Sequence, residues 1–255
     1  MIEEESKWFG KFPDPKYKYH DSDTTYEQFE AFQSIVESNA GEKEIDEFIT
    51  KNPVILTTAL NHFRTGNHKA WVIPKQAISI KSKQTYQKGM IPDFILGGQS
   101  SDGQEWWIVE LKGANEEIFK ILKNDQIKFD DVINKGVCQL LEYVDYASEK
   151  QSFLRDSLGL KNFREPNGLL LIGRSSEFSS LNERKKKLKA AWNRLNKGKL
   201  EIRTYDWLIR QFENTLARQS SIYSIMPKEE YKASGLEALH KLMAIPTKKY
   251  PESED

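Results

Sequence analysis

The sequence contains a single cysteine, Cys138, among 255 residues. One cysteine excludes an internal disulfide and any zinc site built from several cysteines, and it fits a reducing cytoplasm. The four histidines do not show the paired spacing that histidine metal ligands have. We therefore interpret the histidines as surface or core residues rather than ligands.

Signals for targeting and for nucleotide chemistry are also lacking. The chain begins Met1-Ile2-Glu3-Glu4-Glu5, acidic where a signal peptide would be basic and then apolar. No apolar run approaches the roughly 20 residues that a membrane-spanning helix needs. There is no Walker sequence, no glycine-rich dinucleotide loop after a strand and no serine elbow. We expect a cytoplasmic protein with no membrane association.

The chain has no net charge, because 38 basic residues balance 38 acidic ones. Any attraction to nucleic acid must therefore be local. Positive charge is concentrated in one segment, because eight basic residues and no acidic residue lie from Arg184 to Lys199. Such a run is either a helix that follows phosphates or a solvated helix face. With 38% hydrophobic residues, the chain can still build one substantial core or two small ones.

The apolar periodicity predicts an α/β order of elements. A first helix begins at a capping box of Thr24 and Glu27, and a second covers residues 42–51. Later helices are expected at 137–147, at 181–195, after a cap at Asp206, and near 233–243. Strands are expected at 71–82, 91–96, 105–111, 168–173 and 200–204, with a turn at 97–103 and a polar linker at 148–167. This order predicts a mixed sheet flanked by helices.

Two of these strands carry charges that a buried strand does not normally hold. Asp93 lies near the start of one apolar run, and Glu110 and Lys112 end the next. Residues two apart on a strand project to the same side, so Glu110 and Lys112 share one space, and Asp93 approaches them if the two strands pair. A carboxylate there costs several kcal/mol unless a cation or hydrogen bonds compensate it.

A divalent metal ion would supply that compensation. Carboxylate and carbonyl oxygens are the ligands of Mg²⁺ or Mn²⁺, which polarises a phosphodiester and lowers the pKa of bound water. Lys112 would orient the attacking water or stabilise charge on the phosphorus oxygens. The alternative is a cross-strand salt bridge, since the acid-x-lysine triplet also occurs in polar segments such as Glu183 and Lys185.

Pro92-Asp93 followed by Glu110-x-Lys112 resembles the PD-(D/E)xK nuclease superfamily. The flanking sequence is most similar to the nuclease domain at the C-terminus of Shedu anti-phage defence proteins. The matching pieces, within about 42–215, are the segment 42–53, the two strands, Gln139-Leu140-Leu141-Glu142-Tyr143, Leu171-Ile172-Gly173-Arg174 and Arg203-Thr204-Tyr205-Asp206-Trp207-Leu208. The resemblance implies a restriction-endonuclease-like core.

The resemblance also implies roles for individual residues. Asp93 and Glu110 match metal ligands, and Lys112 matches the catalytic lysine. Gln139 and Tyr143 match residues of a helix that lines the site, where they would touch water or phosphate. They are four residues apart and share a helix face, which otherwise would be a solvated polar face.

An upstream acid should join this site from the helix at 42–51, and several acids compete for the role. At 100° per residue, Glu42 lies about 70° from the centre of the apolar stripe, Glu44 about 90° and Glu47 about 150°. Glu42 borders the core best and fits the family spacing as a third metal ligand. Glu44 is the second candidate for the upstream acid, and Asp46 is a further candidate.

The expectation is therefore a Mg²⁺- or Mn²⁺-dependent endonuclease acting on nucleic acid, most simply DNA, in anti-phage defence. The alternative is an inactive nuclease-fold module that docks nucleic acid or a protein. We expect an N-terminal arm and helix at 1–40, the nuclease-like domain at 41–218, and a C-terminal helix and tail at 219–255. A homo-oligomer is compatible with either function.

Overall fold

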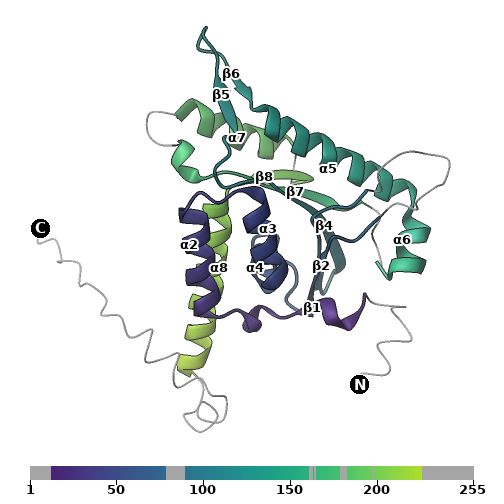
Figure 1. Ribbon diagram of the computed structural model, residues 1–255. Coiled ribbons are helices and arrows are strands. Elements are labelled where there is room, and N and C mark those ends of the chain that lie inside the picture. The colour runs from purple at the N-terminus through teal and green to yellow at the C-terminus, as the bar shows by residue number, and fades with distance from the viewer. Residues whose placement is uncertain are drawn as a thin grey trace, which may run out of the picture.

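A six-stranded mixed sheet forms the centre of the molecule, in the order β1-β2-β3-β4-β7-β8 (Figure 1). The computed structural model describes residues 13–78, 90–160, 163, 165–178, 183–196 and 198–225. The strands of this sheet are β1 (Lys18–Tyr19), β2 (Lys69–Pro74), β3 (Phe94–Ser100), β4 (Gly103–Leu111), β7 (Asn167–Leu171) and β8 (Leu200–Arg203). Neighbours from β1 to β4 are antiparallel, whereas β7 and β8 continue the sheet parallel to β4.

Helices cover both faces of the sheet (Figure 1). One face is covered by α2 (Tyr26–Glu37), α3 (Glu42–Lys51), α4 (Val54–His62) and α8 (Tyr205–Ile225), and the other by α5 (Asp131–Glu149), α6 (Gln151–Leu158) and α7 (Glu183–Leu195). Alternation along the strands divides the apolar side chains between two cores, so that Leu96 lies in one and Ile95 in the other. The predicted α/β fold with a mixed, helix-flanked sheet is confirmed.

The local sequence explains where the first helices begin and end. Helix α3 has the predicted bounds, with Ile45 and Ile49 fully buried and the Glu44 carboxylate accepting the N–H of Gly41 at 3.4 Å. The capping box of α2 is formed by Thr25 and Gln28, one residue later than we predicted. The helix begins at Tyr26, so Thr25 is the N-cap residue. Thr25 and Gln28 therefore accept hydrogen bonds from the free N–H groups at this end of the helix.

The glycine-rich segment 97–103 is not the turn that we predicted. Strand β3 starts at Phe94 and continues through Gly97 and Gly98 to Ser100, so that only two residues connect it to β4. A Cβ atom on Gly97 would lie 2.4 Å from the ring of Trp106 on the paired strand. The glycine therefore provides space for a buried indole rather than a change of chain direction.

Several elements were missed or start at a different residue than we predicted. Helix α4 has no polar face, helix α6 lies inside the expected polar linker, and α5 starts at Asp131 rather than near 137. A two-stranded hairpin, β5 (Phe119–Ile121) and β6 (Ile127–Phe129), projects beyond the main sheet (Figure 1). The expected helix at 233–243 and residues 79–82 of the first expected strand lie outside the described residues.

From the sequence we expected no segment long and apolar enough to span a membrane. Among the helices that the structure describes, none combines the length and the apolar character needed to cross a bilayer.

Candidate active site

Asp93 and Glu110 lie side by side on neighbouring antiparallel strands. Phe94 of β3 is paired with Val109 of β4, so Asp93, the residue before β3, is placed beside Glu110. The Asp93 Oδ2 atom accepts the N–H of Leu111 at 2.7 Å. The two carboxylates therefore meet in the middle of the sheet, where β3 begins and β4 ends.

Glu110 and Lys112 form a buried ion pair on the face of β4 that α5 covers. The Lys112 Nζ atom lies 2.9 Å from Glu110 Oε1, and the side chains are 6% and 5% exposed. Helix α5 approaches closely because residue 136 is glycine, where a Cβ would lie 2.9 Å from Leu170 and 3.5 Å from the Cε atom of Lys112. The predicted pair on one side of β4 thus has a helix directly above it.

Glu42 approaches the same lysine from the opposite helical layer. It is the first residue of α3, and its Oε2 atom lies 3.5 Å from Lys112 Nζ. The absence of a side chain at Gly113 permits this approach, since a Cβ there would be 3.3 Å from the backbone nitrogen of Glu42. Of the competing acids, Glu44 hydrogen-bonds Gly41, and Glu47 lies 3.8 Å from Lys43.

Tyr143 of α5 lies near the carboxylates of Glu110 and Asp93, and Gln139 lies beside Tyr143. The Tyr143 hydroxyl donates to the carbonyl of Ile91 at 3.3 Å and also hydrogen-bonds the Gln139 side chain. Burial, with the nearby charges of Glu110 and Asp93, raises the pKa of Tyr143 to about 12, so the phenol stays protonated. Within the described part of the chain, the buried Gln139 Oε1 atom accepts no hydrogen bond.

Electrostatics set the protonation states of the central pair. Burial raises the pKa of Glu110 to about 7, helped by the charge of Asp93 and opposed by Lys112. Burial lowers the pKa of Lys112, but the charge and hydrogen bond of Glu110 outweigh it, with help from Glu42 and Asp93, so that this pKa is raised. Lys112 is therefore an ammonium ion at neutral pH, a state that suits a partner for negative charge and not a base.

Two residues without a predicted ligand role complete the cluster. The ammonium group of Lys75, which follows β2, contacts Asp93 Oδ1 and lies 2.9 Å from Asp46 Oδ1 of α3. The hydroxyl of Tyr205, at the start of α8, donates to the carbonyl of Lys112 at 2.6 Å. Asp46 was one of the competing acids, and Tyr205 lies in a segment that carries the family resemblance. No pattern in the sequence distinguishes Lys75.

The charges of this cluster favour a cation. The carboxylates of Glu42, Asp46, Asp93 and Glu110 face the ammonium groups of Lys75 and Lys112, and four negative charges against two positive charges leave −2 when all are ionised. An all-oxygen set with this excess charge is chemically suited to Mg²⁺ or Mn²⁺. In the described ranges, however, no three Asp, Glu, His or Cys side chains already converge as a metal site.

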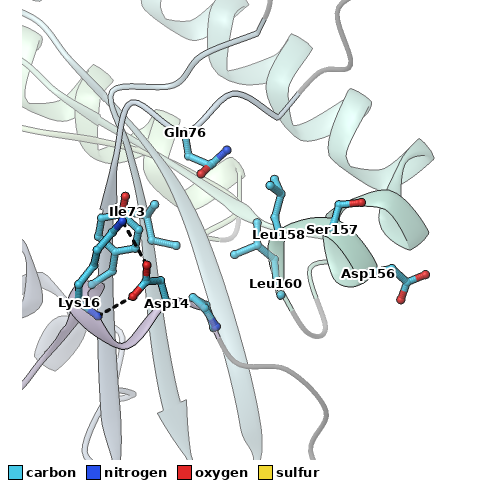
Figure 2. A pocket seen from close by; sticks show the side chains of 11 residues that line it. Asp14, Lys16, Ile73, Gln76, Asp156, Ser157, Leu158 and Leu160 are labelled. Carbon is cyan, nitrogen blue, oxygen red and sulfur yellow. Dashed lines mark hydrogen bonds and ion pairs between the residues drawn. The ribbon is translucent and has the colours of Figure 1, made fainter.

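Two cavities elsewhere are not lined by any predicted site residue. One, of about 370 Å³, lies between Asp14 and Lys16 on one side and Leu158 and Leu160 on the other (Figure 2). The second, of about 460 Å³, lies beyond the C-terminal end of β4, next to Arg174. The carboxylate cluster lies instead where β3 begins and β4 ends.

The basic run 184–199 is divided between the interior and the surface. Lys185 is 6% exposed, and its ammonium lies 3.1 Å from Glu177. Burial lowers the pKa of Lys189 to about 8, with the charge of Arg203 contributing. The exposed basic residues of α7 are Arg184, Lys186, Lys187 and Arg194. Neither interpretation of this run therefore applies to all of its residues.

A comparison with known protein families identifies the family of this chain. The family described as "Shedu protein SduA, C-terminal" matches residues 39–209, well over half of the sequence. The chain belongs to the Shedu family. This membership indicates a role in anti-phage defence. A comparison with individually curated proteins finds no match.

The Shedu region contains a second polar contact that joins distant segments. The Arg174 guanidinium donates to both carboxylate oxygens of Asp206 at 3.0–3.2 Å and to the carbonyl of Val36 at 2.7 Å. The N–H of Ser175 also donates to Asp206. Asp206, which we predicted as a helix cap, therefore connects the end of β7 to α8 and, through Arg174, to the C-terminal end of α2.

Proposed function

We propose that this Shedu protein is a metal-dependent nuclease that hydrolyses phosphodiester bonds of DNA in anti-phage defence. The observation that carries the proposal is the buried Glu110–Lys112 pair, 2.9 Å apart, with Asp93 on the adjacent strand. Burial raises the pKa of Glu110 to about 7 and the charge of Asp93 adds to the rise, a perturbation typical of functional carboxylates and unnecessary in a salt bridge that served only stability.

Glu42, Asp93 and Glu110 are the proposed ligands of Mg²⁺ or Mn²⁺. When bound, the ion would polarise the scissile phosphate and lower the pKa of a coordinated water. The graded exposure of the ligands suits this role, since the side chain of Glu110 is 5% exposed, that of Asp93 13% and that of Glu42 51%. Two acids are held firmly, and the third can adjust on the solvent side.

Lys112 is the proposed catalytic cation. Its raised pKa keeps it protonated, so that it stabilises the negative charge that develops on the phosphorus oxygens. The Oε1 atom of Gln139 can accept a hydrogen bond from a water molecule, and the Tyr143 hydroxyl can donate to a phosphate oxygen in exchange for its 3.3 Å hydrogen bond to the Ile91 carbonyl. These roles need no movement of α5.

The proposed DNA contacts lie on α7 and the adjacent hairpin. The Phe129 ring of β6 packs edge-on against Trp192 of α7, with ring centroids 5.2 Å apart. The exposed side of α7 carries Lys186 and Lys187, and the hairpin carries Lys123. Helix α5, which holds Gln139 and Tyr143, begins directly after this hairpin. Local basic charge of this kind suits phosphate contacts in a chain without net charge.

Plasmid cleavage by the purified protein in Mg²⁺ tests the proposal. We expect wild-type protein to convert supercoiled DNA, while Asp93→Ala and Lys112→Ala each lose at least about a hundredfold in rate. Lys43→Ala, which alters an exposed pair in α3, is the matched control and should cleave normally. Cleavage that survives both site substitutions would refute the assignment of the site.

A docking module without catalysis is the second candidate. One observation favours it, because Lys75 already neutralises Asp93. Such a module has no use for a metal, so calorimetric titration with Mn²⁺ distinguishes the two functions. Binding that disappears in Asp93→Ala supports the nuclease, and absence of binding both in wild type and after removal of the Lys75 charge supports the docking module.

A further inference from the structure

Lys75 supplies the ammonium group that contacts Asp93 and Asp46. Its Nζ atom contacts Asp93 Oδ1 and lies 2.9 Å from Asp46 Oδ1, so that one ammonium bridges two carboxylates from different elements. The other oxygen of Asp93 accepts the N–H of Leu111. Oδ1 is therefore the Asp93 oxygen that remains for a metal ion, and Lys75 holds it.

The backbone of Lys75 is arranged to maintain this contact. Its φ angle is +47°, a left-handed conformation that residues other than glycine rarely adopt. Its N–H also donates to the carbonyl of Asp93 at 2.9 Å. Main chain and side chain of Lys75 therefore both bind Asp93.

The two lysines of the cluster differ in their freedom to move. Lys112 is 6% exposed and lies beneath α5, whereas the Lys75 side chain is 46% exposed. Rotating Lys75 into solvent would break fewer packing contacts than moving Lys112, because nearly half of the Lys75 side chain already contacts water. A metal ion that arrives at Asp93 would therefore displace Lys75, while Lys112 stays in place.

We propose that Lys75 is a resident cation that competes with the divalent ion for Asp93. Without metal, its ammonium compensates Asp93 and Asp46; on binding, the ion takes Oδ1 and Lys75 turns outward, remaining near Asp46. The consequence is a lowered metal affinity, which keeps the site inactive until the local metal concentration or a ligand shifts the balance. This inference rests on the proposed metal site at Asp93.

Calorimetric titration of the full chain with Mn²⁺ alone tests the competition. Lys75→Met keeps the apolar stem and removes the charge, so we expect Mn²⁺ to bind about three- to tenfold more tightly than to wild type. We also expect Mn²⁺ to raise the melting temperature more in this variant, since the metal replaces a missing cation. Lys75→Arg keeps the charge and should bind Mn²⁺ like wild type.

Lys43→Met is the matched control, because Lys43 pairs only with Glu47 among the described residues, at 3.8 Å, and is 89% exposed. Its Mn²⁺ affinity should equal that of wild type. Should Lys75→Met fail to fold, Lys75→Gln, which can still donate to both carboxylates without charge, carries the same expectation.

Each remaining outcome is decisive. Equal or weaker Mn²⁺ affinity in the uncharged variants overturns the competition and leaves the nuclease proposal intact. Absence of Mn²⁺ binding in wild type and in every variant overturns both proposals. Binding that appears only after the charge is removed supports the competition in its strongest form.

Discussion

The hydroxyl of Tyr205 donates to the main-chain carbonyl of Lys112 at 2.6 Å, across 93 residues of sequence. The same hydroxyl lies 3.4 Å from the carbonyl of Leu171 on the neighbouring parallel strand. One fully buried phenol thus joins the start of α8 to the C-terminal ends of β4 and β7. The position of the proposed catalytic lysine depends on this contact as well as on its own strand.

Tyr205→Phe should destabilise the protein by about 1–3 kcal/mol, because it leaves a buried carbonyl without its donor. The shift of the urea midpoint measures this loss. Tyr146→Phe is the control, since no hydrogen bond of the Tyr146 hydroxyl is found among the described residues, and it should shift the midpoint less. Equal midpoints for Tyr205→Phe and wild type would show that the contact contributes nothing.

Stability should depend on pH through Glu110. Its folded-state pKa, about 7, lies above the ordinary value of 4.5, so the folded state holds the proton more tightly than the unfolded state. The free energy of unfolding should therefore fall by about 1–3 kcal/mol as the pH rises from about 5 to 7.5. Metal-free denaturation at several pH values measures this change.

Glu110→Gln is the control for this pH dependence, because the amide cannot titrate. The difference between its profile and that of wild type isolates the contribution of Glu110. Parallel profiles for the two proteins would mean that burial and Asp93 do not raise the pKa of Glu110.

Arg174 and Asp206 should show strong energetic coupling. Arg174 donates to both oxygens of Asp206, and both side chains are about one-fifth exposed. Burial raises the pKa of Asp206, but the hydrogen bond from Arg174 outweighs it and lowers the pKa, so the stability of this pair is lost as the pH falls below about 4. A double-mutant cycle at pH 7 with alanine at both positions should give a coupling of at least about 1 kcal/mol.

Arg155 and Asp156 provide a matched control cycle, because they form a similar two-point contact at 2.7 and 3.0 Å on the exposed surface. That cycle should give no measurable coupling, since water screens the pair. Indistinguishable coupling energies in the two cycles would contradict a structural role for Arg174.

The salt dependence of DNA binding should locate the phosphate contacts. Lys186→Gln with Lys187→Gln should reduce the slope of log affinity against log salt by about 2, or roughly 0.9 for each phosphate that the protein no longer neutralises. Fluorescence anisotropy with a labelled duplex, in a Ca²⁺-containing or metal-free buffer, measures this slope. Lys51→Gln with Arg218→Gln removes the same charge from exposed sites on the other helical layer and should leave it unchanged. An unaltered slope in the α7 variant would remove α7 from the DNA interface.

Much of the fold could be predicted where periodicity and end signals agree. Helix α3 has the expected bounds because its apolar stripe, its first-turn acids and the break at Asn52 all indicate the same segment. The segment 97–103 misled the prediction, because Gly97 and Gly98 are typical of turns when read alone. Helix α4 was missed because seven of its residues are buried and no polar face marks its period.

The sequence by itself determined that Glu110 and Lys112 share one side of a strand and that Asp93 begins the strand before it, because side-chain alternation is a local property of the backbone. Only the tertiary structure decided that Glu42 reaches Lys112, that Gly136 lets α5 cover it, and that Lys75 and Asp46 complete the charge cluster. Those contacts join α3, α5 and the end of β2 across long stretches of chain. Their geometry follows from how the layers pack, which no local pattern encodes.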